Sequence, residues 1–494
     1  MLNRIILIVF VLLVIISAVY ALRDSKEFTT SSEQAYELFL ESRDLLGKLY
    51  IREGIERLQE AVELDSNFAM AHVYLAEQLA RYGENEASDF HLKQALQEYD
   101  NLKKHEKLYI DFRRLINEGK PDSAITVLQR YVEEFPNRTD GHLALGTIAW
   151  EQGEIEKAIS EFEKIVEIEP DFAPVYNNLG YLEFGRGNYD TALRYFERYR
   201  ELLPDQANPH DSKGEILMAI GRYEEALEAF KTAHQIEPRF SFVLYHMAYA
   251  YSGLGQFIKA HQSLDRIRQL CQDYREKREL LINRGRTYWN QGDLEMAHQI
   301  ADSLMQLGYA RPDTNALIWG AMGHAITYAE EDLELARIYL DSARGLIEIS
   351  QSGEKGNSLV DEKLIWVVFA NAQINRFSED YDSLLELEEV VQNKRFWRPD
   401  MTIHFRNLLA VGKYYTGSKK EAFDLIEKSL EINPNHIHSL YISALLHRGE
   451  GDTETALRRM ERILEINRKA DSTYYRINRI KEKYEKLARE NQAA

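Results

Sequence analysis

The sequence predicts an all-α solenoid of helix pairs, because the same residue types return every 34 positions between Thr139 and Tyr274. Four series carry this period: Gly146, Gly180, Gly214 and Ala248; Ala158, Ala192, Ala226 and Ala260; Phe162, Phe196, Phe230 and Leu264; and Pro136, Pro170, Pro204 and Pro238. Small residues let two helix backbones approach, the large residue fills the gap beside their crossing, and proline ends the second helix. A chain of 494 residues, 45% hydrophobic and 29% charged, is too long for one core and suits an array in which each unit contacts its neighbours.

A further glycine series lies between the two predicted helices of each unit, at Gly153, Gly187, Gly221 and Gly255. A residue that tolerates positive φ can end the first helix there. The segment from Pro174 to Asp205, PVYNNLGYLEFGRGNYDTALRYFERYRELLPD, carries small, small, large and proline residues at these offsets and resembles the tetratricopeptide repeat (TPR) family. The resemblance implies a right-handed superhelix of helix-turn-helix units in which the first helix of each unit lines a concave face.

An apolar run precedes the repeats. Ile5 to Leu22 carries no charge, and at about 1.5 Å per residue its 18 residues just reach the roughly 30 Å of a bilayer core. The run also resembles a signal peptide, with Val19 and Ala21 as small residues before a possible cleavage site. We favour an uncleaved anchor because no helix breaker precedes that site. We therefore expect a single-pass protein of the bacterial inner membrane with its repeats in the periplasm or outside, or else a periplasmic or secreted protein after cleavage.

The repeats begin after a linker over residues 23–33, with Ser31 and Ser32 as candidate N-caps of the first helix. The segment from Ala35 to Ala80 resembles the TPR tract that follows the membrane helix in bacterial membrane-spanning regulators. In those proteins a kinase, cyclase or winged-helix domain lies across the membrane, whereas only four residues precede the apolar run here. We therefore expect no effector domain in this chain.

Later in the chain the period becomes irregular and then returns. We expect the regular solenoid over residues 34–274, degenerate TPR-like hairpins over 275–400, two well-formed units over 401–470 and a capping helix over 471–494. The stretch from Gln351 to Ser358 is the clearest internal loop, since it is polar and contains glycines. The last helix is mostly polar, as expected of a cap that seals the final apolar face.

Charge and motif content argue against several function classes. A net charge of −19 argues against nucleic-acid binding, which needs a basic face. The single cysteine, Cys271, excludes a disulfide framework and a multi-thiolate metal site. His436 and His438 lie two apart and so on different helix faces, and the many carboxylates fit exposed ion pairs. We expect no metal site, no cofactor and no enzymatic activity.

The TPR resemblance also implies which side chains point into the concave groove. They come from the first helices: Trp150; Asn177, Tyr181 and Phe184; Asp211 and Glu215; Tyr245 and Tyr249; and Arg286 and Trp289. The stripe is rich in aromatic residues, which partner recognition favours, although some of the rings, Trp150 and Trp289 above all, could instead be core. Asp211 and Glu215 lie four apart on one helical face and would attract cations.

The polar residues of this stripe also bear on the kind of partner. Asn177 and Asn178 invite comparison with TPR proteins that clamp a carboxylate terminus, but the positions of the clamp lysines hold Leu143, Asp211 and Tyr245. We therefore expect protein or peptide partners with basic or neutral segments.

These features predict a non-enzymatic, membrane-tethered or exported scaffold for protein interactions. The alternative is the sensory or ligand-binding half of a split regulator whose effector is a separate chain. An inner-membrane assembly factor with TPR units and a metal knuckle is excluded by the single cysteine.

Overall fold

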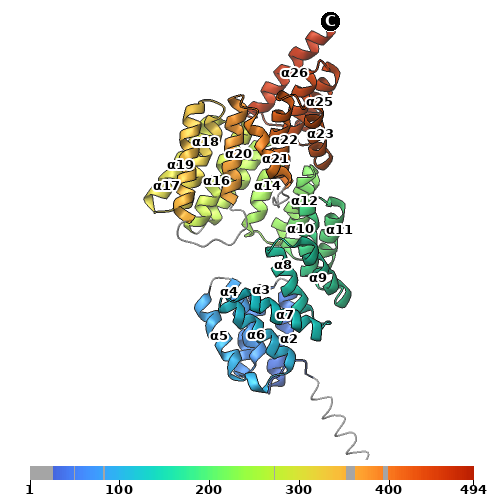
Figure 1. The fold of residues 1–494 in the computed structure, drawn as a ribbon, viewed down its shortest axis with the longest axis vertical. Coiled ribbons are helices and arrows are strands. Elements are labelled where there is room, and N and C mark those ends of the chain that lie inside the picture. The colour runs from blue at the N-terminus through green and yellow to red at the C-terminus, as the bar shows by residue number, and fades with distance from the viewer. Residues whose placement is uncertain are drawn as a thin grey trace, which may run out of the picture. The chain divides into compact units, whose positions relative to one another are not determined.

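The computed structural model describes residues 26–48, 50–81, 84–271, 273–351, 362–392 and 399–493. The predicted anchor or signal segment Ile5–Leu22 and most of the predicted loop after Gln351 lie outside these residues, so both expectations stay predictions. Every regular element in the described part of the chain is a helix (Figure 1). None of the described helices combines the length and the apolar character that crossing a bilayer requires.

The chain divides into two compact units, of which unit 1 ends at Val175 and unit 2 begins at Tyr176. The helices of unit 1 are α2 (Glu33–Gly47), α3 (Ile51–Leu64), α4 (Ala69–Arg81), α5 (Asn85–Gln97), the 3₁₀ turn η1 (Tyr99–Asn101), α6 (Lys104–Asn117), α7 (Pro121–Glu134), α8 (Thr139–Glu151) and α9 (Ile155–Ile168). The predicted N-cap Ser32 is confirmed, since its hydroxyl accepts a hydrogen bond from the backbone N–H of Ala35 at 3.1 Å.

The remaining helices form unit 2, with α10 starting at the boundary between the units. They are α10 (Ala173–Arg186), α11 (Tyr189–Leu202), α12 (Ala207–Ala219), α13 (Tyr223–Ile236), α14 (Ser241–Gly253), α15 (Phe257–Leu270), α16 (Tyr274–Gln291), α17 (Leu294–Ala310), α18 (Thr314–Tyr328), α19 (Leu333–Gln351), α20 (Glu362–Phe377), the 3₁₀ turn η2 (Ser383–Glu386), α21 (Leu387–Gln392), α22 (Pro399–Tyr415), α23 (Lys419–Ile432), α24 (Ile437–Gly449), α25 (Thr453–Ile466) and α26 (Tyr475–Ala493). The final helix α26 covers most of the predicted capping segment 471–494.

The residue series of the repeat perform the packing that the sequence predicts. Phe162 and Phe196 are fully buried, and a Cβ added to Gly146 or Gly180 would lie only 2.5 Å or 2.7 Å from the respective ring. Only glycine lets these helices approach so closely. The turn glycines adopt positive φ as predicted, for example 79° at Gly221.

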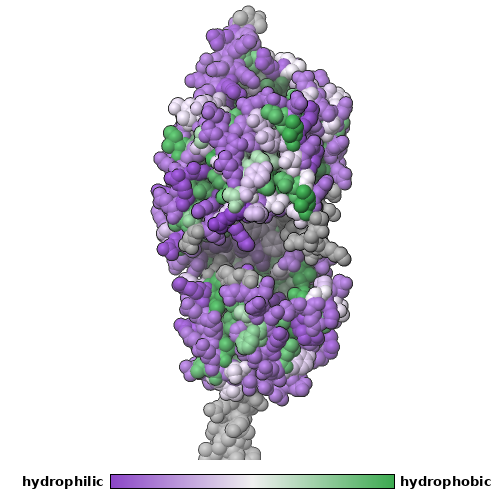
Figure 2. Space-filling view, turned by 90° about the vertical axis from the view of Figure 1, so that its left-hand side faces the viewer, coloured by the Kyte–Doolittle hydropathy of each residue, from purple (hydrophilic) through white to green (hydrophobic). Residues whose placement is uncertain are grey.

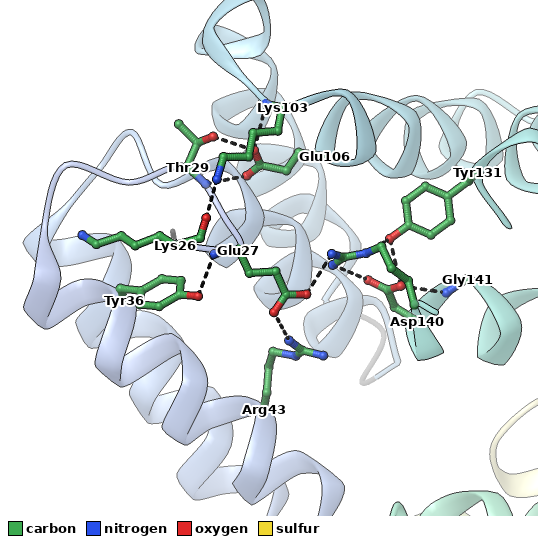
Figure 3. Close-up of polar contacts among 11 residues, drawn as sticks. Lys26, Glu27, Thr29, Tyr36, Arg43, Lys103, Glu106, Tyr131, Asp140 and Gly141 are labelled. Carbon is green, nitrogen blue, oxygen red and sulfur yellow. Dashed lines mark hydrogen bonds and ion pairs between the residues drawn. The ribbon is translucent and has the colours of Figure 1, made fainter. Parts of the chain in front are cut away.

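The segment before the first helix of unit 1, residues 26–31, is fastened to later helices, and we call it the strap. The backbone N–H and the hydroxyl of Thr29 donate to the two carboxylate oxygens of Glu106, at 2.8 Å and 2.5 Å. Glu106 is completely buried and also accepts from the backbone N–H of Lys103 at 2.9 Å, so its carboxylate joins the strap to the start of α6. Figure 3 shows Thr29 and Lys103 on either side of this carboxylate, with the ammonium group of Lys103 turned to the backbone carbonyl of Lys26.

The neighbouring strap residues are held by α2 and by Arg138, which directly precedes α8. Glu27 forms ion pairs with Arg138 at 2.8 Å and Arg43 at 3.7 Å, and its backbone N–H donates to the hydroxyl of Tyr36 at 3.0 Å (Figure 3). Phe28 is fully buried, with the Arg138 guanidinium 4.9 Å from its ring centre. Burial of the Phe28 ring and the ion pairs of Glu27 therefore hold the strap against the helices of unit 1.

Unit 2 makes contacts between residues about 200 positions apart as well as between neighbouring repeats. The loop between α23 and α24 reaches the turn before α13, where the side-chain N–H of Asn435 donates to the Gly221 carbonyl at 2.9 Å. The loop between α25 and α26 reaches the turn before α15, where the N–H of Asp471 donates to the Gly255 carbonyl at 3.0 Å and the Asp471 carboxylate accepts from the N–H of Ile258 at 2.6 Å. The last described repeats thus cover the turns of the middle repeats of unit 2.

The start of α26 completes this contact. The guanidinium of Arg476 pairs with Glu330 at 2.6 Å, donates to the Trp289 carbonyl at 3.0 Å and lies 5.1 Å from the Trp289 ring centre. Gly292, whose φ is 83°, leaves room for Arg476 because it has no side chain: an added Cβ would lie 2.9 Å from the Arg476 side chain.

One face of the molecule is mostly polar. On the face drawn in Figure 2, hydrophilic residues cover most of the area and hydrophobic residues lie in small separate groups. On α13, Glu225 pairs with Arg222 and Glu228 pairs with Lys231, in both cases three residues apart. Such exposed pairs contribute little stability and keep the outer helices solvated.

Candidate partner-binding face

The ten predicted groove residues all lie on first helices of the helix pairs. Trp150 lies on α8 of unit 1, and the others lie on four first helices of unit 2: Asn177, Tyr181 and Phe184 on α10, Asp211 and Glu215 on α12, Tyr245 and Tyr249 on α14, and Arg286 and Trp289 on α16.

Side-chain hydrogen bonds connect these four helices of unit 2 at separations of 31 to 37 positions. The Ser212 hydroxyl donates to Asn177 at 3.1 Å, and the Tyr181 hydroxyl donates to the Glu215 carboxylate. His246 Nδ1 lies 2.8 Å from Asp211 Oδ1. The residues joined in this way form two groups, which we together call the polar ladder: Asn177, Tyr181, Asp211, Ser212, Glu215 and His246 in one, and Tyr249, Asn283 and Arg286 in the other.

The ladder ends at a cavity in unit 2. Arg286 donates to the Tyr249 hydroxyl at 2.9 Å, and its guanidinium lies 4.4 Å from the centre of the Trp366 ring. Beside it is a cavity of about 70 Å³ whose wall includes Trp289, Trp319 and Trp366 together with Ile282 and Ala297. A volume of this size exceeds that of one water, about 10–15 Å³, and its lining is mainly apolar.

Family models match three parts of the chain. All three are described as tetratricopeptide repeats, and they match residues 115–179, 177–238 and 279–303. The chain therefore contains tetratricopeptide repeats in these segments. The matched segments include the helices that carry Trp150, the ladder residues of α10 and α12, and Arg286. A search of the curated proteins finds no match.

Several solved structures are similar to this TPR protein over part of its length. MamA residues 41 to the end from Desulfovibrio magneticus RS-1 is 17% identical with a TM-score of 0.32, and the match covers 34% of this chain and 95% of MamA. PilW, described as a widely conserved type IV pilus biogenesis factor, is 17% identical with a TM-score of 0.36, over 41% of this chain and 92% of PilW. PilF of Pseudomonas aeruginosa is 19% identical with a TM-score of 0.34, over 43% of this chain and 96% of PilF.

Some predicted groove rings also pack against the core of the TPR units. Trp150 lies edge-on to the buried Phe162 at 6.4 Å, and Tyr181 lies edge-on to the buried Phe196 at 5.0 Å. Phe184 packs against Tyr189 at 5.8 Å. Replacing these rings by alanine would therefore damage packing as well as any binding surface.

Burial fixes the protonation of the ladder tyrosine on α10. Burial, followed by the nearby Glu215 carboxylate, raises the pKa of Tyr181 well above its usual value. The hydroxyl therefore stays protonated and donates to Glu215. Burial likewise raises the pKa of Tyr245.

Four residues of this face are missing from the sequence prediction: Ser212, His246, Asn283 and Trp366. Three of them lie 34 or 35 positions from a predicted residue, Ser212 from Asn177, His246 from Asp211 and Asn283 from Tyr249. Extending the predicted set by one repeat length would have identified these three residues from the sequence. Trp366 lies within the irregular part of the chain, on α20, and carries no such signal.

Proposed function

We propose that this chain is a non-enzymatic scaffold that binds segments of partner proteins along the first-helix face of unit 2. TPR units generally serve protein interactions, which supports the scaffold role. The observation that carries the proposal is the tryptophan-lined cavity at the end of the polar ladder. Energetic anchors of interfaces are characteristically apolar pockets beside a few fixed polar groups, and Arg286 is such a group here.

The proposed partner segment is basic or neutral and carries a small aliphatic side chain. The aliphatic group would enter the cavity, and positive charge would face Glu215, whose side chain is 30% exposed. The net charge of −19 adds a general attraction for basic partners that salt would screen.

Filling the cavity tests the proposal without removing any side chain from the core. Ala297 is 4% exposed and lines the cavity, so Ala297→Leu places three extra carbons in that space. We expect quantitative capture of partners from an envelope extract to fall at least tenfold, while helicity by circular dichroism and the melting temperature are retained. Retained capture with a native spectrum would reject the cavity as the binding site.

A matched control alters the opposite side of the helix pair. Glu224, Glu225 and Glu228 belong to α13 and are exposed, so their joint replacement by glutamine removes three charges from an outer helix. Capture at moderate salt should stay unchanged in this variant. Loss of capture in the control together with retention in Ala297→Leu would place recognition on the outer helices.

The proposal includes membrane tethering through Ile5–Leu22, with the TPR units on the exported side of the bacterial inner membrane. The uncharged apolar run supports this part. Full-length protein should fractionate with membranes and be protease-accessible only from the exported side. A soluble mature form beginning at Leu22 would replace the anchor by a cleaved signal and leave export in place.

A further inference from the structure

We infer that a cavity at one end of α16, α18 and α19 is a binding site for a phosphate ester. The cavity has a volume of about 500 Å³, which lies within the roughly 300–1,000 Å³ typical of ligand pockets. It shares no lining residue with the tryptophan-lined cavity. The inference therefore goes beyond the scaffold proposal and does not depend on it.

Three segments of the chain form the wall of this cavity. The start of α16 supplies Tyr274, Arg275 and Arg278, the turn from α17 into α18 supplies residues 311–315, and the end of α19 supplies Ser350. These helices are neighbours in Figure 1 and belong to two consecutive helix pairs. The cavity therefore exists only when the two pairs are packed against one another.

The one carboxylate of the wall, that of Asp313, is already engaged. Its Oδ2 pairs with Arg278 at 2.7 Å, and its Oδ1 accepts from the backbone N–H groups of Asn315 and Ala316 at 2.9 Å and 3.3 Å. Burial alone would raise the pKa of Asp313, but the hydrogen bonds from Arg278 and these N–H groups outweigh it and lower the pKa. Asp313 thus compensates Arg278 and caps α18, which leaves the other two arginines of the wall without a counter-charge.

These two arginines, Arg275 and Arg311, have side chains that form no ion pair or hydrogen bond with the part of the chain that the structure describes. The Arg311 guanidinium lies 5.6 Å from the centre of the Tyr274 ring, and the Tyr274 hydroxyl donates to the Leu307 carbonyl at 2.9 Å. Stacking on a fixed ring holds a guanidinium in place and leaves its N–H donors available. The cavity therefore presents two uncompensated positive charges in a chain whose net charge is −19.

Neutral donors complete the wall and indicate the kind of anion. The Thr314 hydroxyl and the Asn315 side-chain amide hydrogen-bond to no other described residue. A phosphate monoester carries about −1.5 to −2 charges at pH 7 and three acceptor oxygens that point in different directions. It matches two guanidinium groups and two neutral donors better than a carboxylate does, because a carboxylate has one charge and two oxygens in one plane.

The size of the cavity favours an ester over free phosphate. A phosphate group fills only part of a volume of about 500 Å³. The Tyr274 ring and Pro312 supply apolar surface in the same wall, against which the group that carries the phosphate can pack.

The test uses full-length protein in detergent, at moderate salt and without phosphate in the buffer, titrated calorimetrically with glycerol 3-phosphate, inorganic phosphate and glycerol. We expect one equivalent of glycerol 3-phosphate to bind and to raise the melting temperature. Inorganic phosphate should bind at least about threefold more weakly, and glycerol should not bind. Arg275→Gln and Arg311→Gln should each weaken binding of glycerol 3-phosphate by at least about tenfold. Arg275→Gln decides the matter if Arg311→Gln disturbs the fold, since the Arg275 side chain makes no polar contact with the described residues.

The matched control is Arg337→Gln, which removes the same charge from an exposed position of α19 outside the cavity. This variant should bind glycerol 3-phosphate as the unaltered protein does. The inference is overturned if the unaltered protein binds neither phosphate compound, or if Arg275→Gln binds as tightly as the unaltered protein. It is equally overturned if Arg337→Gln weakens binding as much as Arg275→Gln, which would indicate a general attraction to positive charge. Equal affinity for inorganic phosphate and glycerol 3-phosphate would reject the ester and leave free phosphate as the ligand.

Discussion

Two helical glycines, Gly214 and Gly345, have opposite surroundings. A Cβ added to Gly214 would run into the ring of the fully buried Phe230, whereas a Cβ added to Gly345 would meet nothing within 4 Å. The first glycine is required by packing, while the second only adds flexibility to the unfolded chain.

Gly214→Ala should therefore destabilise unit 2 by about 1–3 kcal/mol, because the ring must leave its position. Gly345→Ala should stabilise it by about 0.4–1 kcal/mol through the entropy of the unfolded state. Denaturant melts followed by circular dichroism measure both changes. Equal effects at the two positions would show that the helix crossing tolerates a methyl group.

A histidine pair in unit 1 is built for the neutral form of both rings. His72 Nε2 lies 3.0 Å from the Ser66 carbonyl and must donate to it, so His72 Nδ1 accepts from His91 Nδ1 at 2.9 Å. A further proton on either ring would set two N–H groups against one another. Burial lowers the pKa of His72, and burial followed by the charge of His72 lowers the pKa of His91 to about 4.

This pair should make the stability of unit 1 depend on pH. In the unfolded chain each histidine has a pKa of about 6.5, which is above its pKa in the folded protein. The pair therefore contributes its full stability above about pH 6.5, and this contribution is lost as the pH falls toward 4. Hydrogen exchange of α4 and α5 should accelerate between pH 6.5 and pH 4 after correction for the intrinsic rate. In His91→Gln, whose amide can still donate to His72, part of that acceleration should disappear. The same acceleration in both proteins would contradict the assignment.

At the scale of elements, the strap depends on one buried carboxylate. Both oxygens of Glu106 accept hydrogen bonds, from Thr29 and from Lys103. Glu106→Gln keeps the shape of the side chain but replaces one carboxylate oxygen by an NH₂ group. This group would face the N–H and O–H donors of the strap and α6, so buried donors would lose their acceptor.

We expect Glu106→Gln to cost about 1–3 kcal/mol and to speed hydrogen exchange at the Thr29 amide. Limited proteolysis should then cut the strap before it cuts the helices of unit 1. Glu37→Gln, on the exposed face of α2, is the control and should change neither measurement. Unchanged protection of Thr29 would mean that Phe28 alone holds the strap.

At the scale of the whole molecule, Asp471 caps a helix that is distant in sequence. Its carboxylate accepts from Ile258 near the start of α15, whereas Asp452 accepts from Thr455 at the start of its own helix α25. Asp471→Ala should cost about 0.5–2 kcal/mol, the typical value of a lost cap. Hydrogen exchange should accelerate in both α15 and α26, while Asp452→Ala should affect α25 alone. Acceleration confined to α26 would show that the long-range contact carries no energy.

The period of 34 predicts the helix pairs, their turn glycines and the buried phenylalanines, because these features follow from contacts within one unit and with its neighbour. It also predicts that Tyr181, Glu215 and Arg286 lie on first helices, as they do in the structure. His246 was missed because it follows the predicted Tyr245 by one position, and only its spacing from Asp211 indicates its role. The contacts of Asn435 with Gly221 and of Asp471 with Gly255 follow no period. They depend on the number of repeats between the contacting turns, and the sequence of a single repeat does not specify that number.

These long-range contacts also set an order of events during synthesis. Ile258 and Asp471 are 213 positions apart, so the start of α15 leaves the ribosome long before its cap exists. At about 5–20 residues per second the delay is roughly 10 to 40 s. During that interval the N–H groups at the start of α15 and the turns at Gly221 and Gly255 are exposed, and a chaperone or a second nascent chain can reach them.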